Sequence, residues 1–238
     1  MLPQIVSRKI NSFRSRAKQT RLTILRRLLF GSSSQYGEDL IVDAILGKPR
    51  PFYVDIGANH PEKLSNTIYF YRRGANGINV EPDPTVFPLL ARCRPRDTNL
   101  QMGVGQVEGE LPFYQMNVSS LSTFDRLNAD DQVKAGYRLV ETIRVPVMPL
   151  RRIMEKHAPG KIDFMSIDVE GHEMEILRSN DWDRFRPRLL ILEINRAPQE
   201  IPDFVSKLGY LLIVNNNTNA IFLDLKAEIA RTTLPAGC

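Results

Sequence analysis

The chain has 238 residues, 42% of them apolar and 25% charged, so it can bury roughly 70–75% of its unfolded surface in one core. No run approaches the ~18 consecutive apolar residues of a membrane span, and basic residues interrupt each candidate signal-peptide core. We therefore expect neither a transmembrane segment nor a signal peptide. Cys93 and Cys238 form no metal or disulfide spacing, and cytoplasmic localisation is the expectation.

The net charge of +5 arises at the N-terminus. Residues 1–30 contain eight bases and no acid, whereas residues 31–238 contain 24 bases and 27 acids, a net charge of −3. We predict a basic helical extension over residues 1–33 and a single domain over residues 34–238. A basic arm suits nucleic-acid phosphates, anionic lipid (a peripheral membrane contact) or an acidic partner. The alternative is a helix lying on the domain, because apolar residues recur along it at roughly helical spacing.

From Phe52 onward, short apolar runs alternate with helical patterns, which predicts an α/β fold with a mostly parallel sheet. The expected strands cover residues 52–57, 77–82, 99–105, 161–168 and 188–195. The expected helices cover residues 61–73, 83–93, 150–157 and 198–208.

Three further segments complete this prediction. Residues 109–116 are expected to be a hairpin partner or edge extension of the third strand, and residues 143–150 to be extended. Residues 117–140 are polar and poorly periodic, so we expect a long connection over the carboxyl edge of the sheet. The last two apolar runs predict an antiparallel hairpin around Asn217 and Thr218.

Ligands of open parallel sheets bind beyond the carboxyl ends of the strands. Gly57 permits a sharp turn there, and a helix beginning at Pro61 would direct unpaired N–H groups at an anion or carboxylate. Glu81 follows Gly57 by 24 residues, the spacing at which an acid accepts hydrogen bonds from ribose hydroxyls.

The Gly-x-Gly-x-x-Gly pattern of a dinucleotide site is absent, because Gly57 is the only glycine in this turn. A nucleoside cofactor without a pyrophosphate fits better, and S-adenosylmethionine is the obvious one. The alternative is an ordinary strand-to-helix turn.

Together the motifs resemble the FkbM family of S-adenosylmethionine-dependent methyltransferases over about residues 34–225. They are, in order, "SQYGEDLIV", "FYVDIGANHP", "GINVEPDP", "GVGQVEGELPFY", "IDFMSIDVEGHEMEILRSNDW" and "RLLILEIN". The resemblance implies a class I methyltransferase Rossmann-like sheet of seven strands, mostly parallel with an antiparallel last hairpin. It also implies methylation of hydroxyl oxygens, often on sugars of natural products or on surface glycans.

The same resemblance implies positions for the cofactor. Its methionine part would lie against the first turn, its ribose against Glu81, and its adenine against residues after the second and third strands. The implied cofactor-binding residues are Asp55, Gly57, Ala58, Asn59, Glu81, Pro82, Asp83, Val104 and Gly105. Members of the family frequently have lysine at the position of Ser166, so a role for that lysine is in doubt here.

Methyl transfer to an alcohol needs alignment and a base. Asp168 ends the fourth strand, and His172 follows the Gly171 turn, so we predict these two as catalytic residues with His172 as the base. His60 is the rival, although it is expected to pack over the first turn. Asp168, Glu193 and Asn195 could converge on Mg²⁺ and orient a sugar diol, or they could bind substrate hydroxyls directly.

The leading hypothesis is an O-methyltransferase acting on a hydroxyl of a carbohydrate or glycosylated natural product. The first alternative is an RNA methyltransferase that uses the basic arm, against which the slightly acidic domain argues. The second is a non-catalytic binding module with the same fold.

Overall fold

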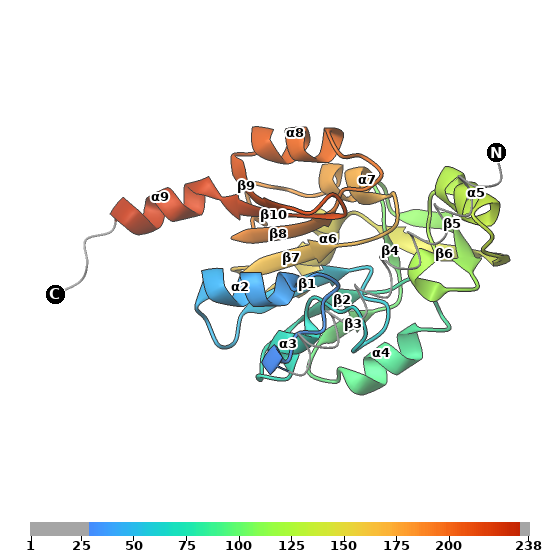
Figure 1. Cartoon of the computed structure of the whole chain (residues 1–238), viewed down its shortest axis with the longest axis horizontal. Helices are drawn as coiled ribbons and strands as arrows, with labels where there is room; N and C mark the ends of the chain where they lie inside the picture. The colour runs from blue at the N-terminus through green and yellow to red at the C-terminus, as the bar shows by residue number, and fades with distance from the viewer. Residues whose placement is uncertain (1–28, 234–238) are drawn as a thin grey trace, which may run out of the picture.

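The computed structural model describes residues 29–233, with side chains as far as Ile229, so the predicted basic extension lies almost wholly outside the described residues. Seven strands form one sheet in the order β3-β2-β1-β7-β8-β10-β9 (Figure 1). The strands are β1 (Phe52–Ile56), β2 (Asn76–Val80), β3 (Thr98–Leu100), β7 (Phe164–Ile167), β8 (Leu189–Glu193), β9 (Tyr210–Asn215) and β10 (Asn219–Asp224). The first five are parallel to one another, and β10 is antiparallel to both β8 and β9. The predicted seven-stranded α/β sheet with an antiparallel last hairpin is confirmed.

The register of the central strands brings their carboxyl ends level. Ile56 pairs with Val80 on one side and with Ile167 on the other, and Ile167 pairs with Leu192. The next residue along each strand is therefore Gly57, Glu81, Asp168 or Glu193. This alignment is what brings residues far apart in the sequence to one edge of the sheet.

Helices cover both faces of the sheet because the strands alternate their side chains between two apolar clusters. Val54 and Met165 pack with α6 (Leu150–His157), α7 (Glu173–Arg178) and α8 (Glu200–Lys207). Tyr53 and Phe164, their neighbours in sequence, pack on the other face with α2 (Glu38–Leu46) and α3 (Ile68–Tyr71). The described chain also contains α4 (Phe87–Cys93) and α9 (Leu225–Thr233).

The predicted third strand is wrong in one respect, because residues 99–105 divide between two sheets. The first part is β3, whereas β4 (Gly103–Val104) joins a second sheet with order β4-β6-β5. Its other members are β5 (Gly109–Met116) and β6 (Leu139–Met148), which pair antiparallel. The hairpin partner of residues 109–116 is therefore β6, which also contains most of the segment predicted as extended.

The predicted helix over residues 61–73 is also wrong: α3 is a four-residue helix that begins at Ile68. Asn59 and Leu64 both have left-handed backbone angles, with φ of 45° and 56°. A helix cannot continue through such a residue, so residues 60–65 form an irregular turn. Consequently, the helix expected to begin at Pro61 is not there to direct its N-terminus at the first turn.

The segment 117–140 crosses the carboxyl edge as predicted, but it contains regular structure. A 3₁₀ turn, η1 (Ser119–Leu121), is followed by α5 (Arg126–Lys134), which Asp125 caps by accepting a hydrogen bond from Leu127 N. In the described part of the chain, no helix has the length and apolar character needed to cross a bilayer.

Candidate active site

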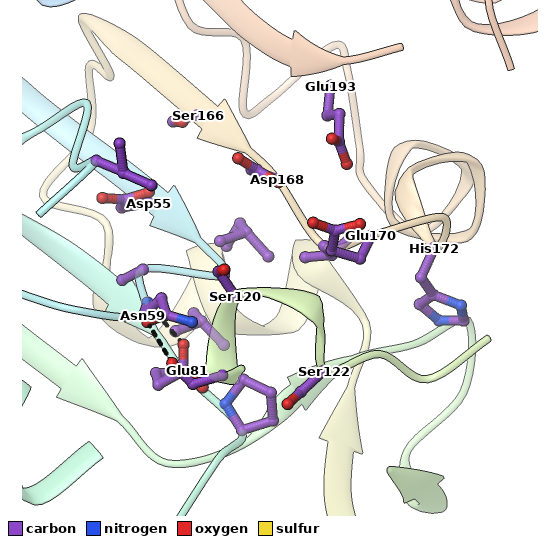
Figure 2. A pocket seen from close by; sticks show the side chains of 18 of the residues that line it. Asp55, Asn59, Glu81, Ser120, Ser122, Ser166, Asp168, Glu170, His172 and Glu193 are labelled. Atoms are coloured by element: carbon purple, nitrogen blue, oxygen red, sulfur yellow. Dashed lines mark hydrogen bonds between the residues drawn. The ribbon is translucent and has the colours of Figure 1, made fainter. Parts of the chain in front are cut away.

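A cavity of about 640 Å³ lies over the carboxyl ends of β1, β2, β7 and β8. The turn after β1 and Glu81 form one side, and Asp168, Glu170 and Glu193 form another (Figure 2). Residues 119–122 and Phe124 cover it, and Gln35 and Tyr36 close it from the segment before α2. This volume falls within the usual range of small-molecule sites.

The turn after β1 requires glycine at position 57. Gly57 has φ of 83°, and a Cβ there would lie 2.0 Å from the Asp168 carbonyl oxygen. The backbone N–H groups of Gly57 and Ala58 both donate to Val80 O, at 2.9 and 3.2 Å. The absence of a side chain thus allows the ends of β1 and β7 to approach each other.

Glu81 is buried, and its two carboxylate oxygens accept backbone hydrogen bonds from opposite directions. Asn59 N donates to Oε2 at 2.7 Å, and Asp83 N donates to Oε1 at 2.8 Å. Burial raises the pKa of Glu81 to about 7, and the two backbone hydrogen bonds oppose this rise. The carboxylate is therefore held rigidly between the first and second turns of the sheet.

Seven of the nine predicted cofactor residues line the cavity: Asp55, Gly57, Ala58, Asn59, Glu81, Pro82 and Val104. Asp83 and Gly105 lie outside the lining. Asp83 Oδ1 accepts from Thr85 and from Gln115 Nε2, and Gly105 N donates to Met148 O in β6. Both residues connect the cavity wall to the second sheet.

Asp55 and Ser166 lie deeper in the cavity, on adjacent strands. Thr67 Oγ1 donates to Asp55 Oδ2 at 2.7 Å, and Asn66 Nδ2 donates to Ser166 Oγ at 2.9 Å. Burial raises the pKa of Asp55 to about 6, although the hydrogen bond from Thr67 opposes this rise. Ser166 is thus held by an amide at the position where lysine is frequent in the family that the sequence resembles.

Three carboxylates converge beyond β7 and β8, with oxygens of Asp168, Glu170 and Glu193 all within 4.8 Å of one another. Asn195, a predicted ligand, instead donates from Nδ2 to Glu193 Oε1 at 2.6 Å. Glu170, which lies within the "DVEGHE" motif, was not predicted as a site residue from the sequence. Its φ of 57° turns the chain back toward Asp168, and local pattern does not reveal such a reversal.

Charge is concentrated in this cluster. Burial and the neighbouring acids raise the pKa of Asp168, of Glu170 and of Glu193 above the ordinary carboxyl range. Glu193 Oε2 is buried and has no hydrogen-bond partner. The Glu173 carboxylate, by contrast, has hydrogen-bond partners, because it accepts from Val169 N and Gly171 N at the start of α7.

His172 precedes α7 and also lines the cavity, at a distance from the carboxylates (Figure 2). Its ring lies 5.7 Å from that of Phe124, and Nε2 is buried without a partner. Burial lowers the pKa of His172, against the effect of Glu175, Asp125 and a backbone hydrogen bond with Val104. Burial therefore favours the neutral imidazole, which lies next to the wall that contains β4.

His60, the predicted rival, organises the irregular turn. Its Nδ1 accepts hydrogen bonds from the backbone N–H groups of Glu62 and Lys63, both at 3.1 Å. This contact replaces the helical start that was expected there. Burial lowers the pKa of His60 as well.

The strand order and the site at the carboxyl edge define a class I methyltransferase fold. The chain belongs to the methyltransferase FkbM domain family, whose model matches residues 55–212. It is therefore a methyltransferase. No curated protein sequence matches the chain.

Several solved structures are similar to this chain at low sequence identity. A methyltransferase from Geobacter sulfurreducens is 12% identical, with 79% of this chain and 78% of that chain covered and a TM-score of 0.42. An O-methyltransferase from Bacillus cereus in complex with SAH is 11% identical, with coverage of 87% and 89% and a TM-score of 0.39. The 1,6-didemethyltoxoflavin-N1-methyltransferase of Burkholderia thailandensis is 10% identical, with coverage of 90% and 88% and a TM-score of 0.43.

Proposed function

We propose that the protein is an S-adenosylmethionine-dependent O-methyltransferase that acts on a hydroxyl of a carbohydrate or a glycosylated natural product. The observation that carries the proposal is one cavity that joins Glu81 and the Gly57 turn to the acids at the ends of β7 and β8. When bound, S-adenosylmethionine supplies an electrophilic methyl group on a sulfonium.

The lining fits that cofactor. Glu81 presents a fixed carboxylate to two ribose hydroxyls, and the Gly57 turn exposes backbone without a side chain in the way. Five acids and a single lysine, Lys63, line the cavity, so a cationic ligand is favoured over a phosphate. The acids are Asp55, Glu81, Asp168, Glu170 and Glu193.

The remaining lining supports a polyhydroxylated acceptor. It contributes amides and hydroxyls from five separate segments, and such groups pair with sugar hydroxyls in either direction. These side chains are Gln35, Tyr36, Asn66, Ser166, Asn195, Thr218 and Asn219. Several of these groups already pair with one another, as Asn66 does with Ser166 and Tyr36 with Thr218, and a neutral, densely hydroxylated acceptor would extend this hydrogen-bond network.

For the base we favour Asp168 over His172. Asp168 adjoins the Gly57 turn, where the methionine end of the cofactor is expected, and a carboxyl with a raised pKa is a competent proton acceptor near neutral pH. His172 instead contacts Phe124 and the backbone of Val104. Its proposed role is to pack beneath the adenine end of the cavity.

We also propose that Asp168, Glu170 and Glu193 can bind Mg²⁺, with Asn195 orienting Glu193. Three clustered carboxylate oxygens suit this hard cation, and Glu193 Oε2 has no other partner. The cation would lower the pKa of an acceptor hydroxyl bound beside it. Calorimetry with Mg²⁺ should give a binding isotherm that Glu193→Gln weakens at least tenfold; an unchanged isotherm would assign the cluster to substrate hydroxyls alone.

The cytoplasm remains the expected compartment, in keeping with the exposed, free thiol of Cys93. The function is tested by incubating the protein with labelled S-adenosylmethionine and a panel of free and nucleotide-activated sugars, with and without Mg²⁺. Label transferred to a sugar hydroxyl supports the proposal. S-adenosylhomocysteine binding without transfer to any sugar would favour the non-catalytic alternative, and label on a phenolic or amino acceptor would replace the substrate class.

A further inference from the structure

Three exposed arginines converge on the C-terminal end of α3, at the amino edge of the sheet and away from the cavity. Arg73 lies over the Tyr69 ring at 3.4 Å and donates to Tyr69 O, and Arg96 donates to Tyr71 O. A Cβ on Gly74 would lie 3.2 Å from Arg50 Nε, which places Arg50 at the same corner.

These guanidinium groups are not neutralised. Within residues 29–233, Arg50, Arg73 and Arg96 form no salt bridge, although other bases of this edge do: Lys48 pairs with Asp163 and Arg72 with Glu62. A cluster of three unpaired positive charges is unfavourable in isolation and favours an anionic partner.

Two apolar side chains lie exposed beside this cluster. Leu29 is 63% exposed and Phe30 is 58% exposed. A Cβ on the adjacent Gly31 would lie 4.0 Å from Arg73 Nη2, and Figure 1 shows the start of the described chain next to α3. The sequence that leads into Leu29, residues 1–28, contains eight bases and no acid.

We propose that this amino-edge patch, Leu29, Phe30, Arg50, Arg73 and Arg96, docks the protein onto an anionic lipid membrane. Leu29 and Phe30 enter the headgroup boundary while the three arginines face the lipid phosphates. A nucleic acid would use the same charges, but it gives no reason for an exposed leucine beside them. Because the five acids of the cavity lie at the opposite edge, docking in this orientation leaves the active site open to the aqueous phase.

The test is co-sedimentation of the full chain with vesicles of phosphatidylcholine alone or mixed with phosphatidylglycerol. We expect binding to the mixed vesicles that weakens as salt rises. The triple variant Arg50→Ser, Arg73→Ser, Arg96→Ser should lower the partition coefficient by roughly a hundredfold, since each basic residue near an anionic surface contributes about fivefold. The pair Leu29→Ser, Phe30→Ser should lower it as well, with little change in salt dependence.

Two further variants separate docking from loss of folding. Replacing the three arginines by lysine retains the charge, so binding should stay within about threefold of the wild type. The triple variant Arg126→Ser, Arg138→Ser, Arg144→Ser removes as much charge near the second sheet and should also leave binding nearly unchanged. Equal sedimentation with neutral and anionic vesicles would overturn the proposal. A second result would also overturn it: the wild type fails to bind mixed vesicles but binds single-stranded RNA in a salt-sensitive manner, and the triple arginine-to-serine variant of the patch loses this RNA binding.

Discussion

Replacing Glu81 by alanine should weaken S-adenosylhomocysteine binding by well over tenfold. In our proposal the Glu81 carboxylate accepts from both ribose hydroxyls, and its two oxygens are fixed for this by Asn59 N at 2.7 Å and Asp83 N at 2.8 Å. Hydrogen bonds to a charged group contribute about 1.5–3 kcal/mol each. Loss of one corresponds to a factor of about 10 to 150 in affinity, and loss of both to about 150-fold or more.

The substitution also leaves two buried N–H groups without an acceptor, which destabilises the fold by about 1–3 kcal/mol per group. Removal of a buried carboxylate offsets part of this loss. Binding should therefore be measured by calorimetry at a temperature where urea denaturation and circular dichroism show the variant to be folded.

Glu62→Ala is the matched control. Glu62 follows the same turn, pairs with Arg72 at the surface and does not line the cavity, so its removal should change affinity less than twofold. A folded Glu81→Ala protein that binds S-adenosylhomocysteine as the wild type does would refute the ribose assignment and, with it, the reading of the cavity as a nucleoside site.

Three other predictions follow from the same geometry. Asp168→Asn should lower kcat by about 10²–10⁴-fold with S-adenosylhomocysteine affinity within threefold, whereas His172→Ala should retain most turnover; the reverse pattern would make His172 the base. Gly57→Ala should lower the free energy of unfolding in urea by about 3–5 kcal/mol, because the new Cβ would meet the Asp168 backbone. The control Gly109→Ala should change it by at most about 0.5 kcal/mol, because a Cβ there meets nothing within 4 Å. Since the pKa of Glu81 is about 7 and ribose hydroxyls favour the ionised form, cofactor affinity should fall as pH drops from 8 to 6, and this fall should be smaller in Glu81→Gln.

The sequence alone determined the main sheet and most of the residues at the carboxyl ends of its strands. The strands at residues 52–57, 77–82, 161–168 and 188–195 are apolar runs between turn residues, and such local patterns specify buried parallel strands. Ligands of parallel sheets bind at the carboxyl ends of the strands, so Gly57, Glu81, Asp168 and Glu193, which lie at or near the ends of these runs, could be assigned to that edge from the sequence. The observed register then brings the four residues level.

Only the tertiary structure decided how the connections run and which side chains meet there. Asn59 and Leu64 adopt left-handed angles that replace the helix expected at Pro61, and Gly103 and Val104 leave the main sheet to pair with β6. Glu170 reaches Asp168 and Glu193 through a left-handed turn, while Asn195 contacts Glu193 instead. These outcomes depend on long-range strand pairing and on the backbone angles of single residues, which contribute little to local periodicity. The sequence therefore identified the carboxyl edge of the sheet, whereas the tertiary structure decided which side chains contact one another there.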